Sequence, residues 1–164
     1  MQDLEHAMRK SSAQGTIYAS AVADSVGISS SDMDCMDFLN LEGRMTAGRL
    51  AELTGLTTGA ITGVVDRMEK VGLVRRERDA EDRRKVFIAP VKESMVKLGR
   101  LYEPLQRAMQ KQSSRYTDVE VRVLLRYATE SYQSILDATT QLKAMVEGMP
   151  KAKPQRPKKA ARVP

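Results

Sequence analysis

Two short stretches in the middle of this 164-residue chain have side chains suited to contacting a nucleic acid. The first contains Thr57, Thr58, Gly59 and Thr62, at the start of a predicted helix. With successive residues about 100° apart, Thr58, Gly59 and Thr62 share one face of the helix with Gly63 and Asp66, opposite an apolar face, and Thr57 precedes them as the N-cap. Threonine hydroxyl and methyl groups on such a face would reach base edges in a groove. Alternatively, the glycines of this helix mark an exposed surface without a role.

The second stretch is residues 79–85, where three acidic residues precede three basic ones, so that the charges nearly cancel. A carboxylate two residues before an arginine, as Asp82 is before Arg84, can hold the guanidinium in a fixed orientation. An arginine at the tip of a hairpin can then enter a narrow minor groove of DNA, where the potential is most negative. The alternative is an ordinary solvated turn.

The elements that would position these residues form a helix-turn-helix followed by a β-hairpin. Thr46 is predicted to cap a helix over 47–53, and Thr57 to cap a second helix that ends at Gly72. The tight turn 54–56 between them is typical of a helix-turn-helix. The β-rich runs 73–78 and 85–89 predict a hairpin, or wing, around the charged stretch. The inner face of the second helix is expected to consist of Ala60, Ile61, Val64, Val65, Met68 and Val71.

Longer helices are predicted on both sides of this motif. Their ranges are 2–24, 31–41, 91–115 and 118–146, with Ser31 and Thr117 as N-caps and a kink or break at Pro104. The last helix has a long apolar stripe, formed by Val121, Leu124, Ala128, Ile135, Leu142 and Val146. We therefore expect a mainly α fold with a small β-hairpin wing. A winged helix-turn-helix domain would span 31–90, a helical dimerisation region 1–30 and 91–146, and a disordered basic tail 147–164.

Charge is unevenly distributed along the chain, whose formal net charge is +6. Residues 150–164 contain six basic residues and no acidic one, whereas residues 1–43 are net acidic and residues 44–90 are net basic. A basic middle segment and a basic tail favour a polyanionic partner, of which nucleic acid is the commonest. Two roles remain open for the tail, as a DNA-binding arm or as an aid to solubility.

Other classes of function lack the residues they need. One cysteine and one histidine exclude a disulfide framework and argue against a metal centre. No glycine-rich phosphate loop or catalytic spacing is visible, so neither an enzyme nor a cofactor is expected. No apolar run reaches the ~20 residues of a membrane span, and the N-terminus does not resemble a signal peptide. A cytoplasmic protein without a membrane partner is the expectation.

Cys35 lies among apolar residues and is expected in the core, with oxidant sensing as the alternative.

Four motifs follow one another in the middle of the chain: Thr46–Thr62, Val65-Asp66-Arg67-Met68-Glu69, Gly72-Leu73-Val74-Arg75-Arg76 and Asp79-x-x-Asp82-Arg83-Arg84. Together they resemble the MarR family of winged helix-turn-helix regulators, and the flanking helices extend the resemblance over about residues 2–146. Ala89-Pro90 departs from the Leu-Thr that usually follows the wing. The resemblance implies a homodimer on double-stranded DNA, with the threonine face in the major groove and Arg84, held by Asp82, in the minor groove. The candidate DNA-binding residues are Thr46, Thr57, Thr58, Gly59, Thr62, Arg67, Arg75, Asp82, Arg83, Arg84 and Lys85.

The resemblance also implies an effector, a small phenolic or other lipophilic anion that binds between the dimerisation and winged regions and releases DNA. Tyr18, Cys35, Met36 and Leu39 are the candidate lining residues. We expect a dimeric, ligand-responsive transcriptional repressor on an inverted-repeat operator, with half-sites about one DNA turn, roughly 34 Å, apart. The alternatives are an architectural DNA-binding protein without sequence preference and a winged-helix module that binds other proteins.

Overall fold

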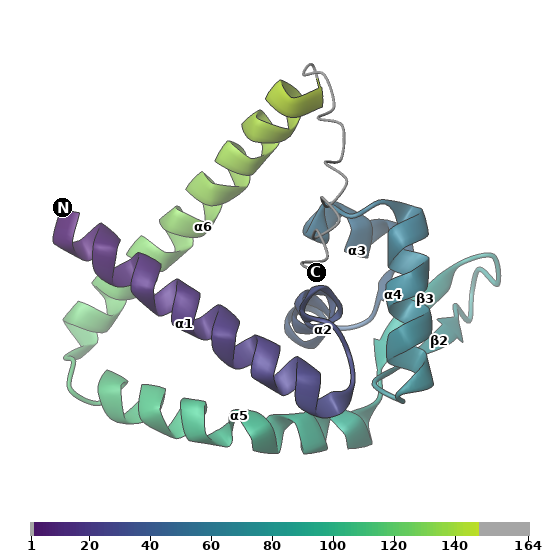
Figure 1. Cartoon of the computed structure of the whole chain (residues 1–164), viewed down its shortest axis with the longest axis horizontal. Coiled ribbons are helices and arrows are strands. Elements are labelled where there is room, and N and C mark those ends of the chain that lie inside the picture. Colours follow the sequence, from purple (N-terminus) through teal and green to yellow (C-terminus); the bar gives the residue numbers. More distant parts are fainter. Residues whose placement is uncertain (1, 148–164) are drawn as a thin grey trace, which may run out of the picture. The chain divides into compact units, whose positions relative to one another are not determined.

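The computed structural model describes residues 2–147 (Figure 1). Residues 148–164, which include nearly all of the predicted basic tail, lie outside this range. The chain divides into two compact units, Met1–Arg107 and Ala108–Pro164, and each is described by itself. Among the described residues, no helix is long and apolar enough to cross a membrane.

The first unit consists of helices and one small sheet. Its elements are α1 (Gln2–Val26), α2 (Ser30–Glu42), β1 (Met45–Thr46), α3 (Ala47–Thr54), α4 (Thr58–Lys70), β2 (Val74–Arg78), β3 (Val86–Pro90) and most of α5 (Lys92–Ser113). The second unit contains the end of α5 and α6 (Asp118–Glu147). The expected fold class, mainly α with a small β wing, is confirmed. Figure 1 shows the hairpin of β2 and β3 beside α4.

Three of the predicted N-caps are present. Thr46 and Thr57 each accept, through Oγ1, the backbone N–H of the residue three positions later, at 3.2 Å in both cases. Thr117 and Glu120 form the predicted capping box at the start of α6. Because each cap involves residues only three positions apart, the starts of α3, α4 and α6 follow from local sequence.

The start of α2 corrects a prediction, because its N-cap is Ser29 and not Ser31. Ser29 Oγ accepts the N–H of Asp32 at 3.2 Å, and the Asp32 carboxylate accepts the N–H of Ser29 at 3.1 Å. Both serines have an aspartate three positions later, so either could form a capping box locally. The earlier start places Asp32 where Arg67 can pair with it, a contact that local sequence does not reveal.

The sheet has a third strand that the sequence did not predict. Its order is β1-β3-β2, with both pairings antiparallel. In β1, Met45 pairs with Ile88 and Thr46 with Phe87. Two residues are too few to show the alternation by which a strand is recognised. The pairing of β2 with β3 confirms the predicted hairpin.

The hydrophobic core of the first unit extends from the end of α1 to the start of α5. Its fully buried members are Ala23, Met33, Cys35, Met36, Leu39, Leu50, Ile61, Val65, Met68 and Val74. On α4, Val64 is also buried as predicted, whereas Ala60 is exposed and Val71 is 41% exposed because it lies at the C-cap. The prediction that Cys35 packs in the core is confirmed. Burial, with smaller effects of nearby carboxylates, raises the pKa of its thiol to about 11.

Of the kink or break predicted at Pro104, the structure contradicts the break, because α5 is a single helix over Lys92–Ser113; the kink stays a prediction. A proline removes one backbone donor and leaves the carbonyl four residues earlier, here that of Arg100, without its helical partner. Pro104 and Arg100 are both exposed, so water can reach that carbonyl and the helix continues.

Helix α6 extends to Glu147, one residue beyond the predicted end. Its apolar stripe is exposed, from 42% at Val121 to 66% at Ile135. A helix of 30 residues with an exposed apolar stripe is typical of an element that packs against a partner.

Candidate nucleic-acid interface

The small polar residues predicted to contact DNA lie at the start and on the exposed face of α4. Thr57 is the N-cap, and Thr58, Gly59 and Thr62 are exposed in the first turns. A Cβ on Gly59 would meet nothing within 4 Å. The Thr62 hydroxyl donates to the carbonyl of Thr58 at 3.1 Å, which fixes the orientation of that side chain. Another molecule can therefore approach the α4 backbone closely here, while Thr46, the N-cap of α3, is only partly exposed.

The wing loop, residues 79–85, is organised by two aspartates. Asp79 Oδ1 accepts the N–H groups of Asp82 and Glu81, both at 3.0 Å, and these bonds lower the pKa of the Asp79 carboxyl. Asp82 Oδ1 accepts both the backbone N–H and the Nε–H of Arg84, each at 3.1 Å. The predicted contact between Asp82 and Arg84 is therefore present. It engages only one N–H of the guanidinium, on a side chain that is 93% exposed.

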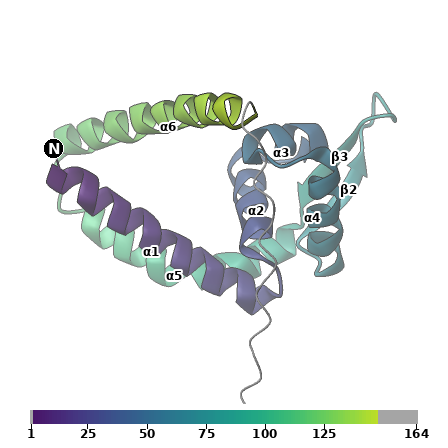
Figure 2. The same ribbon diagram turned by 45° about the horizontal axis from the view of Figure 1, so that its top comes forward.

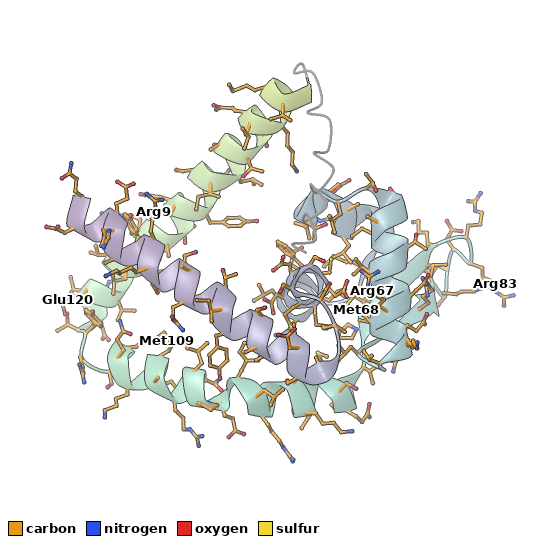
Figure 3. The ribbon with its side chains drawn as sticks, viewed as in Figure 1. Arg9, Arg67, Met68, Arg83, Met109 and Glu120 are labelled. Carbon is orange, nitrogen blue, oxygen red and sulfur yellow. The ribbon has the colours of Figure 1, made fainter. Side chains whose placement is uncertain are left out.

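The other predicted bases of the hairpin differ in their pairing. Arg75 Nε donates to Glu77 Oε1 on the same strand at 2.7 Å. Arg83 and Lys85 are exposed and form no ion pair within residues 2–147. Figure 3 shows Arg83 at the far end of the hairpin, and Figure 2 shows the hairpin extending beyond α3 and α4. Basic side chains without an ion pair thus lie near the tip of the wing, within a loop whose formal charges balance.

Arg67 is held by a carboxylate that the sequence did not point to. Its Nε and Nη2 donate to the two oxygens of Asp32, at 3.0 and 2.6 Å. The Asp32 side chain is 0% exposed, whereas that of Arg67 is 54% exposed. Burial raises the pKa of Asp32, but hydrogen bonds from Arg67 and Ser29 lower it by more, so that the pKa lies below its ordinary value of 3.8. A buried, ionised carboxylate therefore joins the start of α2 to α4, between residues 35 positions apart that no periodicity connects.

Two further arginines, also not predicted, fix the hairpin to its neighbours. Arg76 on β2 pairs with Asp66 at 2.6 Å and with Glu69, and both acids belong to α4. Arg44 lies over the ring of Phe87 on β3, with its guanidinium carbon 4.7 Å from the ring centroid. These arginines hold the wing at a defined position relative to α4 and contribute little free positive charge.

A helix-turn-helix followed by such a wing matches a known family. Residues 26–85 match the sequence model of the MarR family. The HTH-type transcriptional regulator YcgE of Bacillus subtilis (strain 168) is 34% identical over 135 residues, which cover 82% of this chain and 88% of YcgE. The chain belongs to the MarR family.

Solved structures of relatives share the fold of this MarR-family protein. A MarR family protein of Bacillus stearothermophilus superposes with a TM-score of 0.62 at 25% identity, over 82% of this chain and 94% of that one. The transcriptional regulator Tm0710 of Thermotoga maritima gives a TM-score of 0.60 at 22% identity, over 86% and 99% of the two chains. As a member of the family, the protein is a DNA-binding transcriptional regulator. The exposed face of α4 and the wing are its candidate DNA interface.

The four residues expected to contact an effector in this MarR-family protein lie in two environments. A cavity of about 140 Å³ is lined by Met36, Asp37, Asn40, Met95, Leu98, Gly99 and Tyr102, from α2 and α5. Tyr18 lies next to it, with its ring centroid 5.7 Å from that of Tyr102. Cys35 and Leu39 are instead fully buried in the core. Within residues 2–147, the Tyr102 hydroxyl oxygen is the only buried side-chain polar atom without a hydrogen-bond partner.

Proposed function

We propose that this MarR-family protein is a dimeric, sequence-specific repressor whose binding to an inverted-repeat operator is controlled by a small effector. The observation that carries the proposal is the exposed small-residue face of α4 together with the exposed Arg84 that Asp82 holds on the wing. In this arrangement α4 lies in the major groove, with Thr58 and Thr62 against base edges. Arg84 enters the neighbouring minor groove.

The dimer is supported by apolar surface that one chain leaves uncovered. Ile135, Leu142 and Val146 on α6 are each more than half exposed, as is Ile17 on α1. Surfaces of this kind on a soluble domain are typical of protein–protein contacts. We therefore assign dimerisation to the helical segments 1–30 and 91–146, and DNA binding to residues 31–90. Sedimentation equilibrium at micromolar concentration should give twice the mass of the chain, and a monomer would contradict the assignment.

Selection of bound sequences from a pool of random duplexes tests the mode of DNA recognition. The expected product is an inverted repeat with half-sites about 34 Å apart. Arg84→Ala should bind the selected duplex roughly tenfold more weakly. Arg100→Ala, which removes the same charge from an exposed position on α5, should bind as the wild type does. Binding without enrichment would favour an architectural protein, and absence of binding would favour a protein-interaction module.

The effector is expected to bind beside Asp37 on α2. Three cavities, of about 140, 220 and 390 Å³, include Asp37 in their lining, and none of them includes a lysine, arginine or histidine. Burial, and then the neighbouring carboxylate of Asp34, raise the pKa of Asp37. These carboxylates would stabilise a positive charge on a bound effector and destabilise a negative one. The lining therefore favours a phenol or other lipophilic body that carries a protonated amine, in place of the anion implied by the family resemblance.

Three probes with the same phenol ring and different charge test the effector class. Tyramine is cationic, 4-ethylphenol neutral and 4-hydroxyphenylacetate anionic. Tyramine should bind most tightly by calorimetry and should weaken operator binding most. Asp37→Asn should remove the preference for tyramine, whereas Asp24→Asn, on an exposed part of α1, should keep it. Tightest binding of 4-hydroxyphenylacetate would refute the assignment.

A further inference from the structure

The guanidinium of Arg67 pairs with the protein through two of its three nitrogen atoms, Nε and Nη2. Nε and Nη2 are engaged by the buried carboxylate of Asp32, at 3.0 and 2.6 Å. Nη1 forms no hydrogen bond within residues 2–147, and it lies 3.5 Å from the position that a Cβ on Gly63 would occupy. This amino group, on a side chain that is 54% exposed, thus lies over a glycine of α4, one helical turn before Arg67.

This position is at the edge of the face of α4 that would enter the major groove. At about 100° per residue, Arg67 falls between Gly63 and the buried Val64, at the border of the small-residue face. The residues at the edge of a recognition helix face the sugar-phosphate backbone that borders the groove. Because Gly63 has no side chain, Nη1 is left uncovered on that side.

Asp32 determines where this amino group points. An arginine side chain has several rotatable bonds, and an unpaired one loses much of that freedom when it contacts a partner. The two-bond pairing with a carboxylate that is 0% exposed fixes the plane of the guanidinium before any partner arrives. Asp32 is itself held by the N–H of Ser29, within the cap that starts α2.

We propose that Asp32 is a positioning residue for DNA recognition, which holds the Arg67 guanidinium so that Nη1 contacts one phosphate at the edge of each half-site. The inference rests on the proposed mode of DNA binding. It assigns the buried acid a role in specificity, because a fixed phosphate contact sets the register of α4 in the groove.

The test uses the full chain and the duplex that the wild-type protein selects from a random pool. Asp32→Asn should bind this duplex about tenfold more weakly, since the amide offers the guanidinium one acceptor instead of two. It should bind random duplex at least as well as the wild type, because each protomer loses a negative charge. The ratio of the two affinities therefore falls. Asp24→Asn makes the same charge change on α1 and should leave the ratio unchanged.

A change of charge alone would make Asp32→Asn bind both duplexes more tightly, and a purely structural role would leave both affinities of the folded protein unchanged. Either result overturns the proposal. Arg67→Lys provides a second variant that keeps Asp32 and the positive charge. It should lose selected-duplex affinity while the slope of log affinity against log salt stays the same. Arg67→Ala should lower the magnitude of that slope by about 0.9 per half-site. In this background Asp32→Asn should not change the ratio of the affinities for selected and random duplex.

The experiment distinguishes failure of the proposed mode of DNA recognition from failure of the proposed role of Asp32. If a duplex is selected and Asp32→Asn binds it normally, only the role of Asp32 is refuted. If no duplex is enriched, the proposed mode of DNA recognition and the role of Asp32 fall together.

Discussion

Replacing Asp32 by asparagine should destabilise the protein far more than the same change at Asp66. The two aspartates form ion pairs of equal length, since Arg67 Nη2 and Arg76 Nη2 each lie 2.6 Å from a carboxylate oxygen. They differ in burial, because the side chain of Asp32 is 0% exposed and that of Asp66 is 60% exposed. The pair of variants therefore compares a buried carboxylate with an exposed one, whose arginine also keeps Glu69 as a partner.

The expected magnitude follows from what each amide leaves behind. In Asp32→Asn, the new side chain would present an N–H₂ group to donors on Arg67 and Ser29 inside the core, and loss of a hydrogen bond to a charged group typically costs about 1.5–3 kcal/mol. Because Arg67 is half exposed and can turn toward water, we expect about 2 kcal/mol. Exposed ion pairs contribute little, so Asp66→Asn should cost less than about 0.5 kcal/mol.

The difference between wild type and Asp32→Asn should also depend on pH. The pKa of Asp32 is lower in the folded protein than its ordinary value of 3.8, so its ionised form favours the folded state. That stabilisation is present above the ordinary pKa and is lost as the pH falls through the lower, folded value. Asp79 and Glu120 also have lowered pKa values, but they are present in both proteins and their effects cancel in the difference.

Urea denaturation followed by circular dichroism at 222 nm would measure these free energies of unfolding. Wild type and the two variants should be compared at one protein concentration, at pH 7, 5.5, 4 and 3, because unfolding of a dimer depends on concentration. The gap of about 2 kcal/mol expected at pH 7 should persist at pH 5.5 and close toward pH 3. Equal losses in the two variants, or a gap that widens in acid, would refute the account of Asp32 as a buried, ionised partner of Arg67.

Three other outcomes are expected. With a thiol pKa of about 11, Cys35 should react with Ellman's reagent at pH 8 only after unfolding, and peroxide should not release DNA through it; rapid labelling of the native protein would show otherwise. Gly63→Ala should stabilise the protein by up to about 1 kcal/mol, because the glycine is helical and a Cβ has room, whereas Gly55→Ala should destabilise it by a similar amount, because Gly55 has a φ of +73°. Thermal melts of both variants would test this pair. Truncation after Met149 should reduce the salt dependence of DNA binding if the basic residues beyond it contact phosphates, and an unchanged slope would assign them to solubility.

The helices were predictable from the sequence where their signals are local. Thr46, Thr57 and Thr117 each cap a helix through a backbone N–H three positions later, so residue type and spacing contain the whole signal. The inner face of α4 was largely predictable for a similar reason, since Ile61 and Met68 repeat at helical spacing and are buried. The contact of Asp82 with Arg84 spans only two positions and was also predicted.

Features that depend on contacts between distant residues were missed or misplaced. The strand β1 is defined only by its pairing with β3, and the choice of Ser29 as N-cap of α2 goes with the contact of Asp32 to Arg67. Of the kink or break predicted at Pro104, the break does not occur, because a single exposed proline removes one hydrogen bond while the neighbouring turns of α5 continue as helix.

The arginines show why a count of charges did not define the DNA interface. Residues 44–90 are net basic, which indicated a nucleic-acid partner, but Arg67, Arg75 and Arg76 are each paired with a carboxylate in the folded chain. These pairs fix the orientation of the guanidinium groups. A guanidinium fixed by Asp32 loses less freedom on binding a phosphate than an unpaired one, although its net charge is smaller. Asp32 is therefore expected to contribute to specificity, and removing its charge should make binding to random DNA tighter and binding to the operator weaker.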